Sequence, residues 1–176
     1  MRVVADTSTL VSLGTAVDHA RNPLDYLLSD HTVAVPEQVL DELEETGAYE
    51  DSSGRRARSA LDRREKFEYY SVELDETFPL DDGENAAVTL ANDIEATQLL
   101  CDGFNQLALV HASLTTARLV TTPTLLVLLA RGTEFSRKKA KSILTEISEA
   151  RSWSGNTHVN RAQTTLAKQE SDEGSE

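Results

Sequence analysis

The chain has 176 residues, of which 39% are hydrophobic and 27% are charged, and its formal net charge is −13. This length and composition predict one soluble globular domain with a sizeable core. No stretch approaches the roughly 20 apolar residues of a membrane span, so we expect no membrane association. Asp6 interrupts the pattern of a signal peptide, and the single cysteine suits a reducing cytoplasm.

The negative charge argues against non-specific binding of nucleic acid over the whole surface. Acidic residues are spread along the chain, and Arg outnumbers Lys 12 to 5. A lysine-poor, diffusely acidic surface is typical of a halophilic cytoplasm, where salt screens the repulsion between charges. The charge therefore indicates where the protein works more than what it does.

The basic residues are clustered, because two short segments, 55–66 and 131–141, hold 11 of the 17. They could form solvated helix faces with acidic partners one turn away. Alternatively, they could hold phosphate groups near an acidic site. Under this second interpretation the weakly predicted RNA-binding residues are Arg55, Arg56, Arg58, Lys138 and Lys139.

Short apolar segments alternate along the chain with amphipathic ones, which predicts strands alternating with helices. The predicted strands are 3–5, 31–36, 67–74, 97–102 and 117–122. The predicted helices are one from Thr7 or Ser8, 22–30, 36–46, an exposed one within 48–66 after a loop at 52–54, 84–93, 104–114, 123–132 and 134–150. This order predicts a three-layer α/β/α sandwich around a central parallel, Rossmann-like sheet.

We expect the folded domain to cover residues 1–153. The composition becomes polar after that point, so we expect 154–176 to form an extension whose last ~10 residues are disordered.

Four acidic residues occupy notable places in this pattern. Asp6 and Asp102 each end a predicted strand, Glu42 borders the buried face of a helix, and Glu84 lies in the first turn of another. Parallel sheets bind ligands beyond the carboxyl ends of their strands, so we expect these acids to converge. Clustered carboxylates raise one another's pKa, a conflict that a divalent cation resolves. Oxygen ligands favour Mg²⁺ or Mn²⁺, the metals of phosphodiester-cleaving nucleases.

Each acid also has a purely structural interpretation. Asp6 could cap the helix that follows it, and Asp102 could be a turn residue. Glu42 could be solvated, with Asp41 as the competing candidate. Glu84 could simply favour the positive end of its helix.

Five motifs in order extend this interpretation: DTSTLVSL, VPEQVLDELEE, DDGENAAVTLA, LLCDGFNQLA and LVTTPTLLVLLARG. Together they resemble the PIN-domain family of metal-dependent ribonucleases over roughly residues 1–132, and onward to 153. The resemblance implies a PIN-like fold and a Mg²⁺ or Mn²⁺ site. The implied ligands are Asp6, Glu42, Glu84 and Asp102, and the implied supporting hydroxyl is Thr7 or Ser8.

The resemblance also implies partners. RNA is the implied substrate, and a small antitoxin protein is the implied partner, as in a toxin–antitoxin pair. Relatives in the family commonly form homodimers. The apolar helix at 123–132 could serve such pairing or could simply pack in the core.

The chain departs from the family at two places. Gly103 stands where the family often has a second aspartate, with Asn105 as a candidate substitute, and Leu107 stands near the place of a frequent arginine. Two hypotheses follow. The chain is either a metal-dependent endoribonuclease or a catalytically degraded PIN fold that binds RNA or another protein.

Overall fold

The computed structural model describes residues 1–172 and contains a five-stranded sheet in which every pairing is parallel. The strands are β1 (Arg2–Ala5), β2 (Thr32–Pro36), β3 (Glu68–Tyr70), β4 (Gln98–Leu100) and β5 (Arg118–Val120). Their order is β3-β2-β1-β4-β5, so β1 is central. The predicted parallel sheet is confirmed, although β3 covers only part of the strand predicted at 67–74.

The helices up to residue 120 are α1 (Thr7–Gly14), α2 (Pro23–Asp30), α3 (Glu37–Gly47), α4 (Ser52–Leu61), a 3₁₀ helix η1 (Arg64–Lys66), α5 (Asp82–Asp93) and α6 (Leu107–Ser113). Capping side chains set several of their starts. Asp51 accepts a hydrogen bond from the Gly54 N–H, so α4 begins inside the segment predicted to be a loop.

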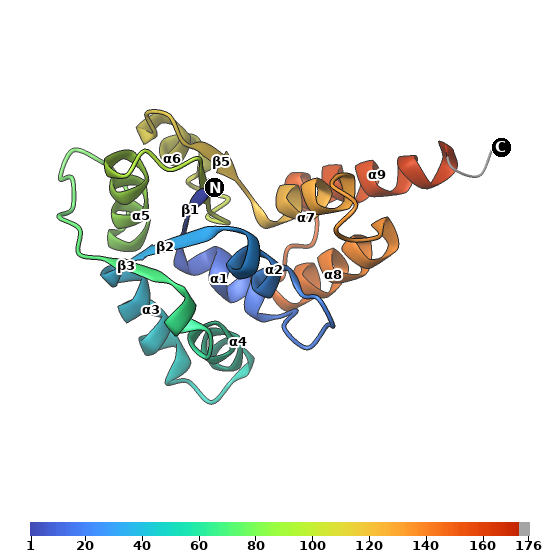
Figure 1. The fold of residues 1–176 in the computed structure, drawn as a ribbon, viewed down its shortest axis with the longest axis horizontal. Helices are drawn as coiled ribbons and strands as arrows, with labels where there is room; N and C mark the ends of the chain where they lie inside the picture. The colour runs from blue at the N-terminus through green and yellow to red at the C-terminus, as the bar shows by residue number, and fades with distance from the viewer. Residues whose placement is uncertain (173–176) are drawn as a thin grey trace. The chain divides into compact units, whose positions relative to one another are not determined.

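Both faces of the sheet are buried at its central strands. Val4 pairs with Ala34 and with Leu99, and these three side chains share a cluster with α5. Figure 1 shows α5 beside the sheet, and α5 packs on β1, β2 and β4. Val3 and Val33 point to the opposite face and are equally buried. Two covered faces explain why residues 3–5 of β1 and 33–36 of β2 are continuously buried, and they give the chain an α/β/α fold.

The direction in which the chain crosses the sheet reverses at β1. β2 and β3 lie on one side of it, whereas β4 and β5 lie on the other. In open parallel sheets, ligands bind at this switch point, beyond the carboxyl ends of the two strands that border it. Here those strands are β1, which is followed by Asp6, and β4, which is followed closely by Asp102.

The described part of a second compact unit, residues 121–172, is helical. It contains α7 (Thr122–Arg131), α8 (Arg137–Ala150) and α9 (Thr157–Asp172), which pack on one another. α7 buries most of its apolar side chains, as expected if it serves core packing. Within residues 1–172, no helix has the length and apolar character that crossing a membrane requires.

The C-terminal segment differs from the sequence-based expectation. α9 buries Val159, Ala162 and Leu166, and it includes 167–172 at the start of the tail predicted to be disordered. The remaining part of that predicted tail, 173–176, lies outside the described residues. The domain boundary at 153 stays a prediction.

Candidate functional site

Asp6 lies at the switch point and is tied to both neighbouring elements. Its backbone N–H donates to the Leu100 carbonyl at 3.1 Å, which continues the pairing of β1 with β4. Its carboxylate accepts from the Thr9 N–H at 3.0 Å, which caps α1. The side chain is 3% exposed, and this burial raises the pKa of Asp6 to about 6, with Asp102 adding repulsion. Asp6 therefore caps α1 and is also a buried candidate ligand.

Ser8 connects Asp6 to Asp102. The Ser8 hydroxyl donates to the Asp6 carboxylate, lying 2.8 Å from each oxygen, and it accepts from the Asp102 backbone N–H at 2.9 Å. Asp102 is 4% exposed. One hydroxyl thus holds together the acids that follow β1 and β4.

Cys101 lies directly behind these acids. It is 1% exposed, and its burial, together with the nearby Asp6 charge, raises the pKa of the thiol. The Gly103 N–H donates to its sulfur at 3.4 Å. The thiol therefore stays protonated and belongs to the core.

Glu42 faces the site from α3, with its hydroxyl partner on α1. The Thr7 hydroxyl donates to the Glu42 carboxylate, which is half-buried, whereas the neighbouring Asp41 is exposed. Burial raises the pKa of Glu42, and the charge of Asp81 adds to this, while the Thr7 hydrogen bond acts in the opposite direction. The geometry therefore favours Glu42 over Asp41 as the candidate site residue of α3. Thr7 donates to the carboxylate of Glu42, whereas Ser8 donates to that of Asp6.

Glu84 projects from the first turn of α5 into the same region. Its Oε2 is buried and, among the described residues, has no hydrogen-bond partner. Burial raises the pKa of Glu84 to about 7, with further contributions from Asp81, Asp6 and Glu42. A buried carboxylate oxygen without a donor is costly, so a cation or a proton at this atom would lower its free energy.

The predicted acids therefore gather at one edge of the sheet. The charge of Asp102 raises the pKa of Asp6, and the charges of Asp6 and Glu42 raise the pKa of Glu84, so these carboxylates are close enough to repel one another. No group of three or more acidic, histidine or cysteine side chains within residues 1–172 is arranged to hold a metal ion. The chemistry nevertheless fits a hard divalent cation, because the donors are oxygens, one of them is unpartnered, and their negative charges repel one another.

Sequence reasoning missed Asp81. Its carboxylate accepts from the Glu84 N–H at 2.8 Å, which caps α5, and its charge raises the pKa of both Glu84 and Glu42. The signal was present in the sequence, because an aspartate three residues before a glutamate is typical of a helix start.

Asn105 lies in the turn 104–106 and is exposed. Its expected role as a substitute ligand stays a prediction. Gly103 lies between β4 and α6, directly beside Glu84.

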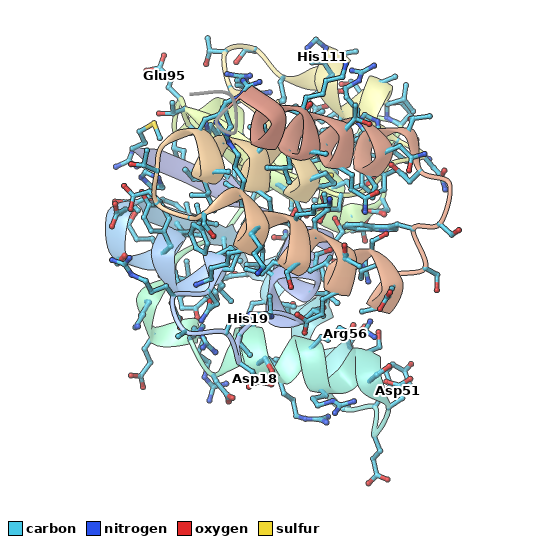
Figure 2. The ribbon with its side chains drawn as sticks, turned by 90° about the vertical axis from the view of Figure 1, so that its right-hand side faces the viewer. Asp18, His19, Asp51, Arg56, Glu95 and His111 are labelled. Carbon is cyan, nitrogen blue, oxygen red and sulfur yellow. The ribbon has the colours of Figure 1, made fainter. Side chains whose placement is uncertain are left out.

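The basic residues of α4 have structural partners. Arg58 donates to the carbonyls of Gly47 at 2.6 Å and Tyr49 at 2.8 Å, and thereby caps the end of α3. Arg56, labelled in Figure 2, donates to the Ser52 hydroxyl at 3.2 Å within α4. These contacts favour a structural role for Arg58, and RNA binding by either residue stays a prediction.

The other weakly predicted RNA-binding residues are less engaged in the fold. Arg55 and Lys138 are exposed. The Lys139 ammonium lies 4.9 Å from the centre of the Phe135 ring, a cation–π contact. Their contact with RNA likewise stays a prediction.

Comparison with known proteins identifies the family. A family model described as a PIN domain matches residues 2–168, which include the whole sheet and all four predicted acids. No curated protein matches the chain. PIN domains are generally nucleases, and they typically use divalent metals. Since the match covers almost the whole length of the sequence, the chain belongs to the PIN-domain family.

Proposed function

We propose that this protein is a Mg²⁺- or Mn²⁺-dependent endoribonuclease. The observation that carries the proposal is the crowding of carboxylates at the switch point, where the buried Glu84 Oε2 has no partner among the described residues. Burial and mutual repulsion raise the pKa of Asp6 to about 6 and that of Glu84 to about 7. A bound dication would remove both the repulsion and the unmet hydrogen-bonding need.

We assign the residues as follows. Asp6, Glu84 and Asp102 would hold the metal, and Glu42 would either hold it or orient the attacking water. The proposal requires these side chains to turn closer together than they lie here, because no three of them share a point within residues 1–172. The bound cation would supply positive charge that stabilises the phosphoryl group during cleavage.

The surrounding residues would maintain this arrangement. Ser8 holds the Asp6 carboxylate against the backbone of Asp102, and Thr7 holds the Glu42 carboxylate. Neither hydroxyl needs to contact RNA, because each acts through the carboxylate that it orients. Arg55 would contact phosphates outside the acidic site, which positions an RNA strand without reading its sequence. Lys138 and Lys139, in the second compact unit, are separate candidates for phosphate contact.

The partners belong to the same proposal. The family resemblance supports a cytoplasmic toxin restrained by a small antitoxin protein, and pairing of the chain with itself. RNA bound at the site would bring its negative phosphates close to the carboxylates, and a bound cation would offset this repulsion. Binding of RNA and binding of the metal should therefore each strengthen the other.

Cleavage of a labelled RNA tests the proposal. The native chain should cut RNA in Mn²⁺ or Mg²⁺ and stop when EDTA is added. Asp6→Asn and Glu42→Gln should each reduce the rate at least about 100-fold, because each removes a charge expected to contact the metal or the water. Asp41→Asn is the matched control, since it removes an exposed carboxylate one residue from Glu42, and it should cleave at the native rate.

Equal cleavage by the native chain and by Asp6→Asn would rule out the nuclease assignment for this site. So would cleavage that persists after chelation of all divalent metal.

A catalytically degraded PIN fold that binds RNA or protein is the second candidate. Gly103 in place of an acid, the exposed Asn105 and the lack of a ready three-ligand group within residues 1–172 favour it. Calorimetric titration with Mn²⁺ separates the two functions. Binding in the micromolar range supports the nuclease, whereas RNA binding without Mn²⁺ binding supports the degraded fold.

A further inference from the structure

Two glycines border the acidic residues, and neither is needed for an unusual backbone conformation. Gly83 lies in the first turn of α5, and Gly103 lies between β4 and α6. Among the described glycines only Gly155 has a positive φ. What distinguishes these two positions is therefore what occupies the space that a side chain would take.

The space at Gly83 is taken by the carboxylate of Glu42. A Cβ atom at position 83 would lie 2.5 Å from Glu42 Oε2 and 2.7 Å from Glu42 Cδ, whereas real Cβ contacts are essentially never under 3.0 Å. On the other side, the Thr7 hydroxyl donates to the same carboxylate. Glu42 is thus held between a hydroxyl of α1 and the bare backbone of α5.

The space at Gly103 is taken by Glu84. A Cβ atom there would overlap Glu84 Oε1, while the next nearest atoms, Glu84 Cδ at 3.4 Å and Cys101 Sγ at 3.5 Å, are at ordinary contact distances. One carboxylate oxygen, at the end of the flexible Glu84 side chain, is therefore the atom that must move before a side chain fits at this position. The opposite oxygen, Oε2, is the buried atom that has no partner among the described residues.

We propose that Gly83 and Gly103 are positioning residues that admit the carboxylates of Glu42 and Glu84 to the site. In each case the carboxylate comes from an earlier element of the chain. The carboxylate of Glu42, on α3, packs against Gly83 of α5, and the carboxylate of Glu84, on α5, packs against Gly103 after β4. The functional meaning of this arrangement rests on the proposed metal site, whereas the packing of carboxylate on glycine does not.

This changes the interpretation of the missing acid at position 103. The absence of a side chain there does not simply remove one oxygen, because the volume is filled by the carboxylate of Glu84. An acid at 103 and the present position of Glu84 exclude each other. Gly103→Asp, which adds a carboxylate, should therefore weaken metal binding instead of strengthening it.

A double-mutant cycle tests the packing without any metal. Unfolding midpoints in EDTA are compared for the native chain, Gly103→Ala, Glu84→Ala and the double variant. Gly103→Ala should lower the midpoint of the native chain and have little effect in the Glu84→Ala background, because the obstructing carboxylate is gone. Gly132→Ala is the control, since its Cβ would meet Leu128 O at an ordinary 3.4 Å, and it should have the same effect in both backgrounds.

Mn²⁺ titration followed by electron paramagnetic resonance tests the functional part. Gly103→Ala and Gly103→Asp should each weaken Mn²⁺ binding by about tenfold, a loss typical of changes that misplace a metal ligand. Gly132→Ala should bind as the native chain does. A crystal structure of Gly103→Ala should show the Glu84 carboxylate displaced from its place over residue 103.

Additive midpoint changes in the cycle would overturn the proposal, as would tighter Mn²⁺ binding by Gly103→Asp. If the native chain binds no Mn²⁺, the proposed nuclease function fails. The EDTA cycle still decides the glycine proposal in that case, so the two failures are distinguishable.

Discussion

At the level of single residues, Asp6 accepts the hydrogen bond that caps α1 and also lies at the switch point of the sheet. The sequence left capping and ligand binding as alternatives, but one carboxylate has room for both. Oδ1 accepts from the Thr9 N–H, and the Ser8 hydroxyl lies within 2.8 Å of both oxygens. A capping role is therefore no evidence against a site role.

The buried charge of Asp6 should make stability depend on pH. Burial raises the pKa of Asp6 from 3.8 to about 6, so between these values the folded state holds a proton that the unfolded state has lost. Stability contributed by this group is therefore present at low pH and is lost as the pH rises through about 4 to 7. Asp6→Asn keeps the cap and removes the charge. In EDTA near pH 7.5 it should be more stable than the native chain by about 1–3 kcal/mol.

Urea unfolding at a series of pH values measures this difference. The advantage of Asp6→Asn should shrink toward pH 4, where the native carboxyl is protonated in both states. Asp41→Asn, at an exposed carboxylate of α3, should show no comparable trend. A difference between Asp6→Asn and the native chain that is constant with pH would contradict the explanation.

Which acids border the site was predictable, but how they are supported was not. The pattern singled out Asp6, Glu42, Glu84 and Asp102 because strand ends and helix faces have recognisable periods. The division of the Thr7 and Ser8 hydroxyls between two carboxylates depends on rotamers of adjacent residues, which no spacing rule reveals.

At the level of elements, predicted and observed segments agree best where an apolar period coincides with a cap. α2, capped by Asn22, and α7, capped by Thr121, lie close to their predicted ranges for this reason. α9 was missed because its composition is polar, although Val159, Ala162 and Leu166 follow a helical spacing. Three apolar residues in a mostly polar segment were too few to predict a helix from the sequence.

Arg58 joins two helices, and its removal should show this. Arg58→Ala loses hydrogen bonds from a charged donor to the carbonyls of Gly47 and Tyr49 at the end of α3, which we expect to cost about 1 kcal/mol of unfolding free energy. Arg55 lies on the same helix and is exposed like Arg58, but it does not hold the end of α3, so Arg55→Ala should change stability by less than about 0.5 kcal/mol. Guanidinium or thermal unfolding of both variants checks the contrast.

RNA affinity should depend more on Arg55 than on Arg58. If Arg55 contacts phosphates, Arg55→Ala should weaken RNA binding and reduce its dependence on salt.

Equal losses of stability in Arg58→Ala and Arg55→Ala would refute the structural role of Arg58.

At the level of the whole molecule, the class of fold was predictable, because alternating strands and helices allow few architectures. The order β3-β2-β1-β4-β5 was not, since several orders fit the same alternation. This order matters for the site, because it makes β1 and β4 neighbours and so brings Asp6 and Asp102 together. Local patterns identified the residues, and only the long-range pairing placed them side by side.

The net charge of −13 should make stability depend on salt. Self-repulsion of a strongly charged chain opposes compaction, and screening relieves it. We expect the thermal unfolding midpoint to rise by several degrees as KCl increases from low concentration to about 1 M, where the Debye length is about 3 Å, and then to level off.

A neutral osmolyte at matched osmolality serves as the control, because it stabilises without screening. A midpoint that falls or stays constant with KCl would refute the halophilic interpretation of the acidic surface.

The position of Cys101 has a practical consequence for measuring motion. It is the one thiol of the chain, it is buried, and it contacts the carboxylate of Asp6. An alkylating reagent can reach it only when the end of β4 separates from its surroundings, and the raised pKa of the thiol slows the reaction further. The rate at which Cys101 is alkylated therefore measures how often the end of β4 separates from its surroundings. Slower alkylation in the presence of Mn²⁺ or RNA would show that either ligand makes this separation rarer, without any assay of cleavage.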